Sequence, residues 1–468
     1  MVPERLLPHT ALDGLHRRRR LRLAWLRASG RVLTFTTAAL RRVLDVTVAA
    51  ILSAATGPIA VAAMITAPSR GKPPLLHRTY LGRWMKPIEV GVLPGAPRGL
   101  RHIPRLWAIV RGDMSLVGPA LMALDDARSL TAVDLERFQV RPGLADLFMV
   151  RSAANIAFDG RSAAAVEQVH TASLFRDLGL LVRALPAAVM RGRKAVAPHA
   201  LSILGVRMDN WTMHRAVSWI VDAPHDGPLQ TLAFVNPDCL NIAWRDDGYR
   251  EILSKSSVVL PDGIGIHYAC RMLGTHLAAN VNGTDLFPRL CDTLETRDQS
   301  IFLLGGRPGV TDALVERLAQ RWPRLRVAGH HHGYFDRGGD EEKAIVDMIN
   351  SSRADHLLVA FGAPHQERWI ADHRDQLRVR VAIGVGGLFD FYSGAIPRAP
   401  LWMRELGFEW TWRLLQEPGR MWQRYVIGNP LFLWRVWRWR GSEGFPNRNP
   451  SATINQRPTM EEKGEDDV

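Results

Sequence analysis

The residues best suited to chemistry lie in turns that follow short apolar runs. Asp262 stands in one of them, LPDGIG, between an apolar run and a helix-like stretch. There its carboxylate would be exposed in a cleft. The alternative is that Asp262 caps the N-terminus of a helix over residues 264–273, a role that suits aspartate. Spacing alone favours the cap.

Two pairs of adjacent glycines, Gly305-Gly306 and Gly386-Gly387, occupy comparable turns in LLGGRPG and VGGLFD. Such residues let backbone N–H groups approach a diphosphate closely at the start of a helix. Glycine turns also simply end strands, so a diphosphate site and a plain turn are both open at this point. The turns contain no Walker A, GxGxxG or GxSxG motif, which excludes those nucleotide-binding and hydrolase signatures.

The residue pattern gives little support to a metal site. His330, His331 and His332 are consecutive, so on a strand they point to alternate faces, and no carboxylate pair at a suitable spacing completes a site. The cysteines lack a CxxC spacing, which argues against thiolate zinc and against a disulfide framework. They are Cys239, Cys270 and Cys291. We expect reduced thiols, a cytosolic environment, and neither a metal nor a cofactor.

Five short β-branched or apolar runs must position these turns. Each is followed by Gly, Pro or Asp and then by a helix-like stretch, which is typical of a parallel α/β sheet. The runs are Thr231–Val235, Val258–Leu260, Ile301–Leu304, His356–Phe361 and Val379–Val385. Ligands of such sheets bind at the carboxyl ends of the strands. We therefore predict an α/β, Rossmann-like C-terminal domain whose site is formed by these turns.

The first half of the chain carries the positive charge. Residues 1–200 contain 29 Lys and Arg against 13 Asp and Glu, whereas residues 201–468 contain 31 against 33. Arginines cluster just before residues 46–69, a run without ionisable side chains, and this order favours a membrane surface. The run could span a bilayer. Gly57-Pro58, however, predicts a break into two halves, and hence a re-entrant hairpin with both flanks in the cytosol; a buried core helix is the alternative.

The rest of the first half predicts a mainly helical domain. Amphipathic stretches cover 103–110, 130–138 and 174–190, and residues 191–199 have the composition of a linker. Near the other end, residues 397–440 hold seven of the 15 tryptophans and eight arginines. Such a mixture could stack nucleic acid bases or sit among lipid headgroups, and a diphosphate ligand on a membrane would satisfy both features.

From Ile203 to Trp437, an ordered series of motifs resembles the WecG/TagA/CpsF glycosyltransferases. The motifs include FVNPD, LPDGIGI, NGTDLF, IFLLGGRPGV, FGAPHQERWI, IGVGGLFDFYSG and WRLLQEPGR. The resemblance implies transfer of a sugar from a nucleoside diphosphate, usually UDP, to a polyprenyl-diphosphate-linked sugar at the inner membrane face. It also implies inversion at the anomeric carbon and no requirement for a metal.

The same resemblance implies roles for individual residues. It makes Asp262 the general base for the acceptor hydroxyl, and so reverses the preference for a helix cap. It places Asn236 and Gln366 in the substrate pocket. Three C-terminal arginines would offset the charge of the departing diphosphate: Arg413, Arg420 and Arg424. One departure concerns Ala279 and Asn280, which stand where the family often has Glu-Arg.

Residues 41–190 resemble, more faintly, the bacterial sugar transferases that make polyprenyl-diphospho-sugars. The matching strings are RRVLDVTVAAI, IPRLWAIVRGDMSLVGP and VRPG. Arg101 and His102 replace the Asp-Glu pair that the family uses for catalysis, and neither side chain can act as a carboxylate nucleophile. The family's Pro-Arg-Pro is also changed, to Pro119-Ala120-Leu121. These losses predict a catalytically silent domain.

The predicted organisation has four parts: a basic segment 1–40, a degenerate membrane-associated domain 41–198, a glycosyltransferase domain 199–444 and a disordered tail 445–468. The predicted function is extension of a lipid-linked glycan, for exopolysaccharide or cell envelope, at the cytosolic face of the inner membrane. The expected partners are a nucleoside diphosphate sugar, a polyprenyl-diphosphate-linked acceptor and the membrane, but not nucleic acid; a homo-oligomer is compatible with this. The alternatives are an enzyme with both halves active and a non-enzymatic scaffold.

Overall fold

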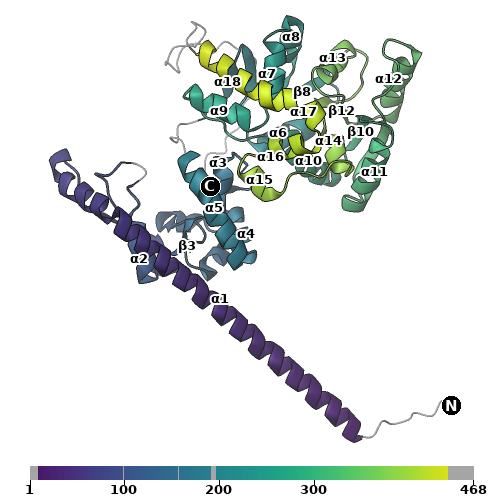
Figure 1. The fold of residues 1–468 in the computed structure, drawn as a ribbon. Coiled ribbons are helices and arrows are strands. Elements are labelled where there is room, and N and C mark those ends of the chain that lie inside the picture. The colour runs from purple at the N-terminus through teal and green to yellow at the C-terminus, as the bar shows by residue number, and fades with distance from the viewer. Residues whose placement is uncertain (1–8, 98–99, 157, 191–196, 441–468) are drawn as a thin grey trace. The chain divides into compact units, whose positions relative to one another are not determined.

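The computed structural model describes residues 9–97, 100–156, 158–190 and 197–440 (Figure 1). Within them the chain forms two compact units. Unit 1 comprises the chain up to Met149 together with Asp159–Leu185, and unit 2 comprises Val150–Phe158 together with the chain from Pro186. The predicted tail 445–468, the first eight residues of the basic segment and most of the predicted linker lie outside the described residues.

Unit 1 begins with the long helix α1, His9–Thr66 (Figure 1). The predicted break at Gly57-Pro58 is wrong, because the helix continues through Pro58. A proline removes one backbone hydrogen bond and can bend a helix without ending it. The part Thr36–Thr66 has a mean hydropathy of 2.0 over its most apolar window, which is 17% buried. By length and composition alone, it could cross a membrane.

Polar residues at the start of this apolar part fasten α1 to the rest of unit 1. The guanidinium of Arg42 donates to the carbonyl oxygens of Ile109 and Val110, over 2.6 and 2.8 Å. These two residues belong to helix α2, Pro104–Arg111. The buried carboxylate of Asp45 accepts hydrogen bonds from Ser115 and Leu116. Two side chains of α1 thus satisfy polar groups of α2 and of the GDMSLVGP segment that follows it.

The other elements of unit 1 agree with the predicted helices in part. Helix α2 covers 103–110 almost completely, and α5, Leu174–Met190, has the predicted limits. Residues 130–138 instead contain a 3-10 helix, Val133–Gln139, because Asp134 accepts bonds from the N–H and hydroxyl of Thr131 and tightens the turn. Short strands, which were not predicted, form two small sheets: β1 Leu76–Leu81, β2 Pro87–Val92 and β4 Met122–Ala123, and the pair β3 Ser115–Val117 and β5 Gly143–Ala145.

Unit 2 confirms the predicted parallel α/β fold. Its six-stranded sheet has the order β11-β10-β12-β13-β8-β9, and neighbouring strands are parallel. All five predicted runs are strands, and β11 is an addition. The bounds are β8 Gln230–Val235, β9 Val258–Pro261, β10 Ser300–Gly305, β11 Arg326–His331, β12 His356–Ala360 and β13 Val381–Gly384.

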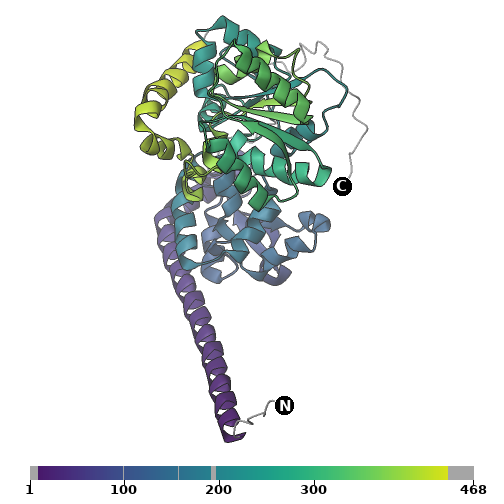
Figure 2. The same ribbon diagram turned by 90° about the vertical axis from the view of Figure 1, so that its right-hand side faces the viewer.

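Helices cover both faces of this sheet (Figure 2). Side chains that alternate along the strands pack into separate cores, with Leu232 on one face and Ala233 on the other. The first face carries α6 Met213–Val221, α10 Gly283–Arg297, α11 Val310–Arg321 and α14 Leu388–Tyr392. The second carries α7 Pro237–Ala243, α8 Asp247–Lys255, α9 Ile264–Met272, α12 Asp340–Ser352, α13 His365–Asp372 and α18 Gly428–Trp439.

Strands β8 and β13 are neighbours whose following helices, α7 and α14, lie on opposite faces. A crevice forms at such a switch point, beyond the carboxyl ends of the two strands. The C-terminal segment then supplies α15 Leu401–Glu405, α16 Glu409–Gln416, α17 Pro418–Trp422 and a π-helical turn Gln423–Ile427 before α18. The fold therefore directs the turns selected from the sequence toward one edge of the sheet.

Candidate active site

A cleft of about 950 Å³ opens at this edge in unit 2. The turns after β8, β9 and β13 contribute Asn236, Asp262 and the pair Gly386-Gly387 to its lining, and the start of α13, which follows β12, contributes Gln366. Helices α16 and α17 and the π-helical turn add the predicted arginines Arg413, Arg420 and Arg424. The structure thus brings together every predicted site residue except Gly305 and Gly306.

Asp262 does not cap a helix. Helix α9 starts at Ile264, its N-cap is Gly263, and no side chain caps it. Gly263 has a φ of 92°, a conformation that glycine adopts readily. The backbone N–H of Asp262 donates to the carbonyl of Val235 over 2.8 Å. Among the described residues, no hydrogen bond to its carboxylate is found, so its oxygens are available to a ligand.

The surroundings of Asp262 adjust its basicity. Burial raises the pKa of its carboxyl group to about 6, and the nearby carboxylate of Glu409 acts in the same direction. The guanidiniums of Arg424 and Arg413 oppose this rise. A carboxylate with such a pKa is still ionised at neutral pH, yet it accepts a proton more readily than an ordinary aspartate.

Asn280 supports the turn that carries Asp262. Its Oδ1 accepts a hydrogen bond from the N–H of Gly263 over 2.7 Å, and its own N–H donates to the carbonyl of Asn155 over 2.9 Å. The side chain is buried, with 8% exposed. The sequence marked Asn280 only as a departure from a family pattern. Its contribution comes from a contact between residues 17 positions apart, which no local pattern reveals.

Asn236 and Gln366 line the cleft, but both use their side-chain oxygens within the protein. Asn236 is the N-cap of α7, and its Oδ1 accepts from the N–H groups of Asp238 and Cys239 over 3.0 and 3.1 Å. For its Nδ2, the described part of the chain provides no partner, so this group can donate to a ligand. The Gln366 oxygen accepts from two backbone N–H groups.

Gly305 and Gly306 are not among the residues that line the cleft. Gly305 ends β10, where a Cβ would lie 2.6 Å from the carbonyl oxygen of Ala360 in β12. Close backbone packing therefore requires glycine at position 305, which agrees with the alternative that this turn simply ends a strand. Gly387 does line the cleft, and a Cβ there would lie 2.5 Å from the Arg413 guanidinium. The second glycine pair therefore makes room for a cation.

The three predicted arginines have only part of their charge compensated. Arg413 and Arg420 both approach the carboxylate of Glu417, over 3.8 and 3.2 Å. Arg424 lies 3.4 Å from the carboxylate of Asp238. Two guanidiniums thus share one carboxylate, so the three arginines together carry one positive charge more than the two carboxylates that they approach. Such a surface favours an anionic ligand such as a diphosphate.

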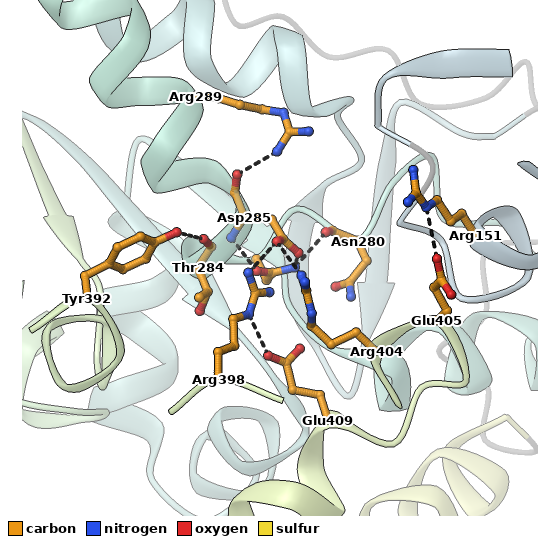
Figure 3. A network of polar contacts seen from close by, with 11 residues as sticks. Arg151, Asn280, Thr284, Asp285, Arg289, Tyr392, Arg398, Arg404, Glu405 and Glu409 are labelled. Carbon is orange, nitrogen blue, oxygen red and sulfur yellow. Dashed lines mark hydrogen bonds and ion pairs between the residues drawn. The ribbon is translucent and has the colours of Figure 1, made fainter. Parts of the chain in front are cut away.

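A network of ion pairs fastens the C-terminal segment to α10 (Figure 3). The buried carboxylate of Asp285 accepts from Arg398 over 2.6 Å and from Arg404 over 3.4 Å. Arg398 also donates to Glu409 over 2.9 Å. Burial alone would raise the pKa of Asp285, but the two guanidiniums outweigh it and hold this pKa below its usual value. The network thereby positions α16, which contributes Glu409 and Arg413 to the cleft.

Comparisons with known proteins identify the family. Residues 201–444 match the family model described as the glycosyl transferase WecG/TagA/CpsF family. The chain belongs to this family. In the first half, residues 98–191 match the model described as bacterial sugar transferase. Unit 2 thus contains the matched region of the WecG/TagA/CpsF glycosyltransferase, and the cleft described above lies in it.

Two relatives carry the same printed name, N-acetylglucosaminyldiphosphoundecaprenol N-acetyl-beta-D-mannosaminyltransferase. The one from Bacillus subtilis (strain 168) is 34% identical over 195 residues, which is 42% of this chain and 74% of the relative. The one from Staphylococcus aureus (strain MW2) is 33% identical over 238 residues, which is 50% of this chain and 91% of the relative. The chain is therefore a glycosyltransferase of the type that acts on polyprenyl-linked glycans.

Two other sets of predicted positions are not among the residues that line the WecG/TagA/CpsF cleft. His330, next to the end of β11, pairs with Asp312 over 3.0 Å, and the residues described contain no group of three or more His, Cys, Asp or Glu side chains suited to a metal ion.

In unit 1, Arg101 precedes α2 and donates to the carbonyl of Ala96 over 3.2 Å. A guanidinium thus makes a structural bond where the resemblance would place a carboxylate.

Proposed function

We propose that this protein transfers a sugar from a UDP-sugar to a saccharide on polyprenyl diphosphate, with inversion and with Asp262 as the general base. The observation that carries the proposal is the half-buried Asp262 carboxylate, which is free of hydrogen bonds within the described residues and stands in a cleft that the three predicted arginines also line. The relatives named above are mannosaminyltransferases that act on an undecaprenol-linked N-acetylglucosamine, which supports this acceptor class.

In the proposed reaction, the acceptor hydroxyl oxygen attacks the anomeric carbon of the donor while its proton passes to Asp262. The bond between this carbon and the diphosphate oxygen breaks on the opposite side, so the configuration inverts. Negative charge develops on the departing diphosphate, and Arg413, Arg420 and Arg424 offset it by bidentate hydrogen bonds. The Nδ2 group of Asn236 is a further donor available to the substrates.

For the first half we propose membrane association without catalysis, with the limits 41–198 for this domain and 199–444 for the glycosyltransferase domain. The apolar part of α1 supports membrane association, since Ile51 and Ile65 are 63% and 72% exposed. Arginines precede it in the sequence, as expected at the cytosolic face of the inner membrane. Arg101 and His102 support the absence of catalysis by this domain, because neither side chain can act as the nucleophile.

A direct assay tests the proposed function. The full-length protein in nanodiscs would be given a panel of UDP-sugars and, as a contrast, GDP-sugars, with polyprenyl-diphospho-sugar acceptors. We expect one UDP-sugar to yield a lipid-linked product whose new glycosidic bond has the inverted configuration, and Asp262→Asn to abolish most of this product. A retained configuration, or equal turnover by the Asp262 variant, would contradict the mechanism.

A further inference from the structure

Gln366 connects two turns that line the cleft. Its Oε1 accepts hydrogen bonds from the N–H of Gly362, over 3.1 Å, and from the N–H of Gly386, over 2.9 Å. Gly362 follows β12 and Gly386 follows β13, and both line the cleft. A carbonyl oxygen has two lone pairs, so this one side-chain atom is fully used in holding the two turns at a fixed separation.

Glu367 determines which way the Gln366 amide faces. The Nε2 of Gln366 donates to the Glu367 Oε1 over 2.7 Å, and the two side chains are 3% and 4% exposed. An ionised carboxylate can only accept hydrogen bonds. If the amide were reversed, its NH₂ group would face two backbone donors and its oxygen would face the carboxylate. The buried pair therefore permits one orientation.

The space around this amide is also restricted. A Cβ on Gly384, in β13, would lie 2.7 Å from the Gln366 Nε2. The amide is thus held between the end of a core strand and a buried carboxylate, and within the described part of the chain its second N–H has no protein acceptor. The arrangement fits a side chain that orders the protein backbone better than one that binds substrate.

We propose that Gln366 is a positioning residue that fixes the two cleft turns, and that Glu367 orients it. The consequence for activity rests on the proposed function. The turn at Gly386 leads into Gly387, against which the Arg413 guanidinium packs, so the position of this turn affects the position of the guanidinium. If the turns separate, the cation moves relative to Asp262. We therefore expect weaker donor binding and slower transfer, although Gln366 itself need not touch the reacting atoms.

An exchange of donor and acceptor between the two residues tests this. Gln366→Glu alone places two carboxylates against each other in a buried site, which is strongly unfavourable. Adding Glu367→Gln restores the pattern, because Glu at 366 still accepts from both turns and receives a bond from Gln at 367. Gln366→Met removes the acceptor without adding charge. Gln320→Glu, on the exposed surface of α11, is the matched control for a Gln-to-Glu change.

The first measurement is hydrogen exchange of the backbone amides in residues 361–366 and 384–388, followed by mass spectrometry. Exchange should accelerate about 10- to 100-fold in Gln366→Glu and Gln366→Met, the range expected for one or two lost hydrogen bonds. It should return to within about threefold of the parent in the double variant. Burial raises the pKa of Glu367 to about 7, so the comparison should be made at about pH 8.5, where the carboxylate is ionised.

The second measurement is the donor KM and the kcat of transfer, which should follow the exchange rates across the four variants. Should the parent transfer no sugar, the proposed function fails, while the exchange rates still decide the role of Gln366. Parent-like exchange in Gln366→Met with a raised KM would overturn positioning in favour of substrate contact. Amide exchange in a folded double variant that remains as fast as in Gln366→Glu would also overturn the positioning role. If Gln366→Glu does not fold, Gln366→Met supplies the decision.

Discussion

Replacing Asp262 by Asn should separate activity from stability. The change removes the proton acceptor but hardly alters the shape of the side chain, so the cleft should persist. We expect transfer to fall by roughly 10²–10⁴-fold, the usual contribution of a general base. In the parent, the rate should also fall as the carboxylate becomes protonated. With a pKa of about 6, the rate at about pH 5 should be roughly one tenth of its plateau.

The same substitution should stabilise the fold at neutral pH. The folded-state pKa of Asp262 is raised from 3.8 to about 6, so its contribution to stability is largest when it is protonated and is lost as pH rises through this range. Each unit corresponds to about 1.4 kcal/mol, which sets an upper limit of about 3 kcal/mol, and solvent screening at a half-buried group reduces this to roughly 1–2 kcal/mol. Asn avoids this cost of ionisation.

The assay combines single-turnover transfer between about pH 5 and pH 8.5 with thermal unfolding of the same samples. We expect the variant to be slower, to lack the acidic limb of the pH profile and to melt at a higher temperature at about pH 8 but not at about pH 4. Activity within a few-fold of the parent would remove Asp262 from the mechanism. A lower melting temperature at every pH would contradict the expected stabilisation, because it would show that the carboxylate has a structural partner.

Asn280→Ala should slow transfer about tenfold without raising the acceptor KM, because the Asp262 turn loses one hydrogen bond; an unchanged kcat would contradict its positioning role. Arg398→Met should destabilise unit 2 by about 1–3 kcal/mol, as measured by urea unfolding, since the buried Asp285 carboxylate loses its shorter ion pair and keeps the longer one to Arg404. Ile65→Asp should weaken sedimentation with anionic liposomes, whereas Met348→Asp should not; equal binding would count against the role of α1. Finally, Asp262→Asn protein given UDP-sugars and polyprenyl phosphate should release no UMP, and release coupled to polyprenyl-diphospho-sugar would establish that both halves are active.

Local pattern was sufficient for five of the six strands in the sheet of unit 2, but not for β11, whose sequence RVAGHH is not an apolar run. Each of the five is a short apolar run that ends in a residue unsuited to continuing it, and both properties belong to neighbouring residues. Because parallel strands direct their carboxyl ends to one edge, the grouping of Asn236, Asp262 and Gly386 around one cleft could also be expected. The small strands of unit 1 were missed, since several are only two or three residues long and carry no alternating pattern.

Only the tertiary structure decided what individual side chains do. The glycine at 305 and the use of Gln366 as a link between turns are explained by contacts and hydrogen bonds outside the local motif. The continuation of α1 through Pro58 is likewise visible only in the structure. The Arg398–Asp285 pair joins residues 113 positions apart. The sequence by itself determined the strands, the turns and the family, because these depend on residue type and local order. The hydrogen-bond partners depend on distances between remote segments, which exist only after the chain has folded.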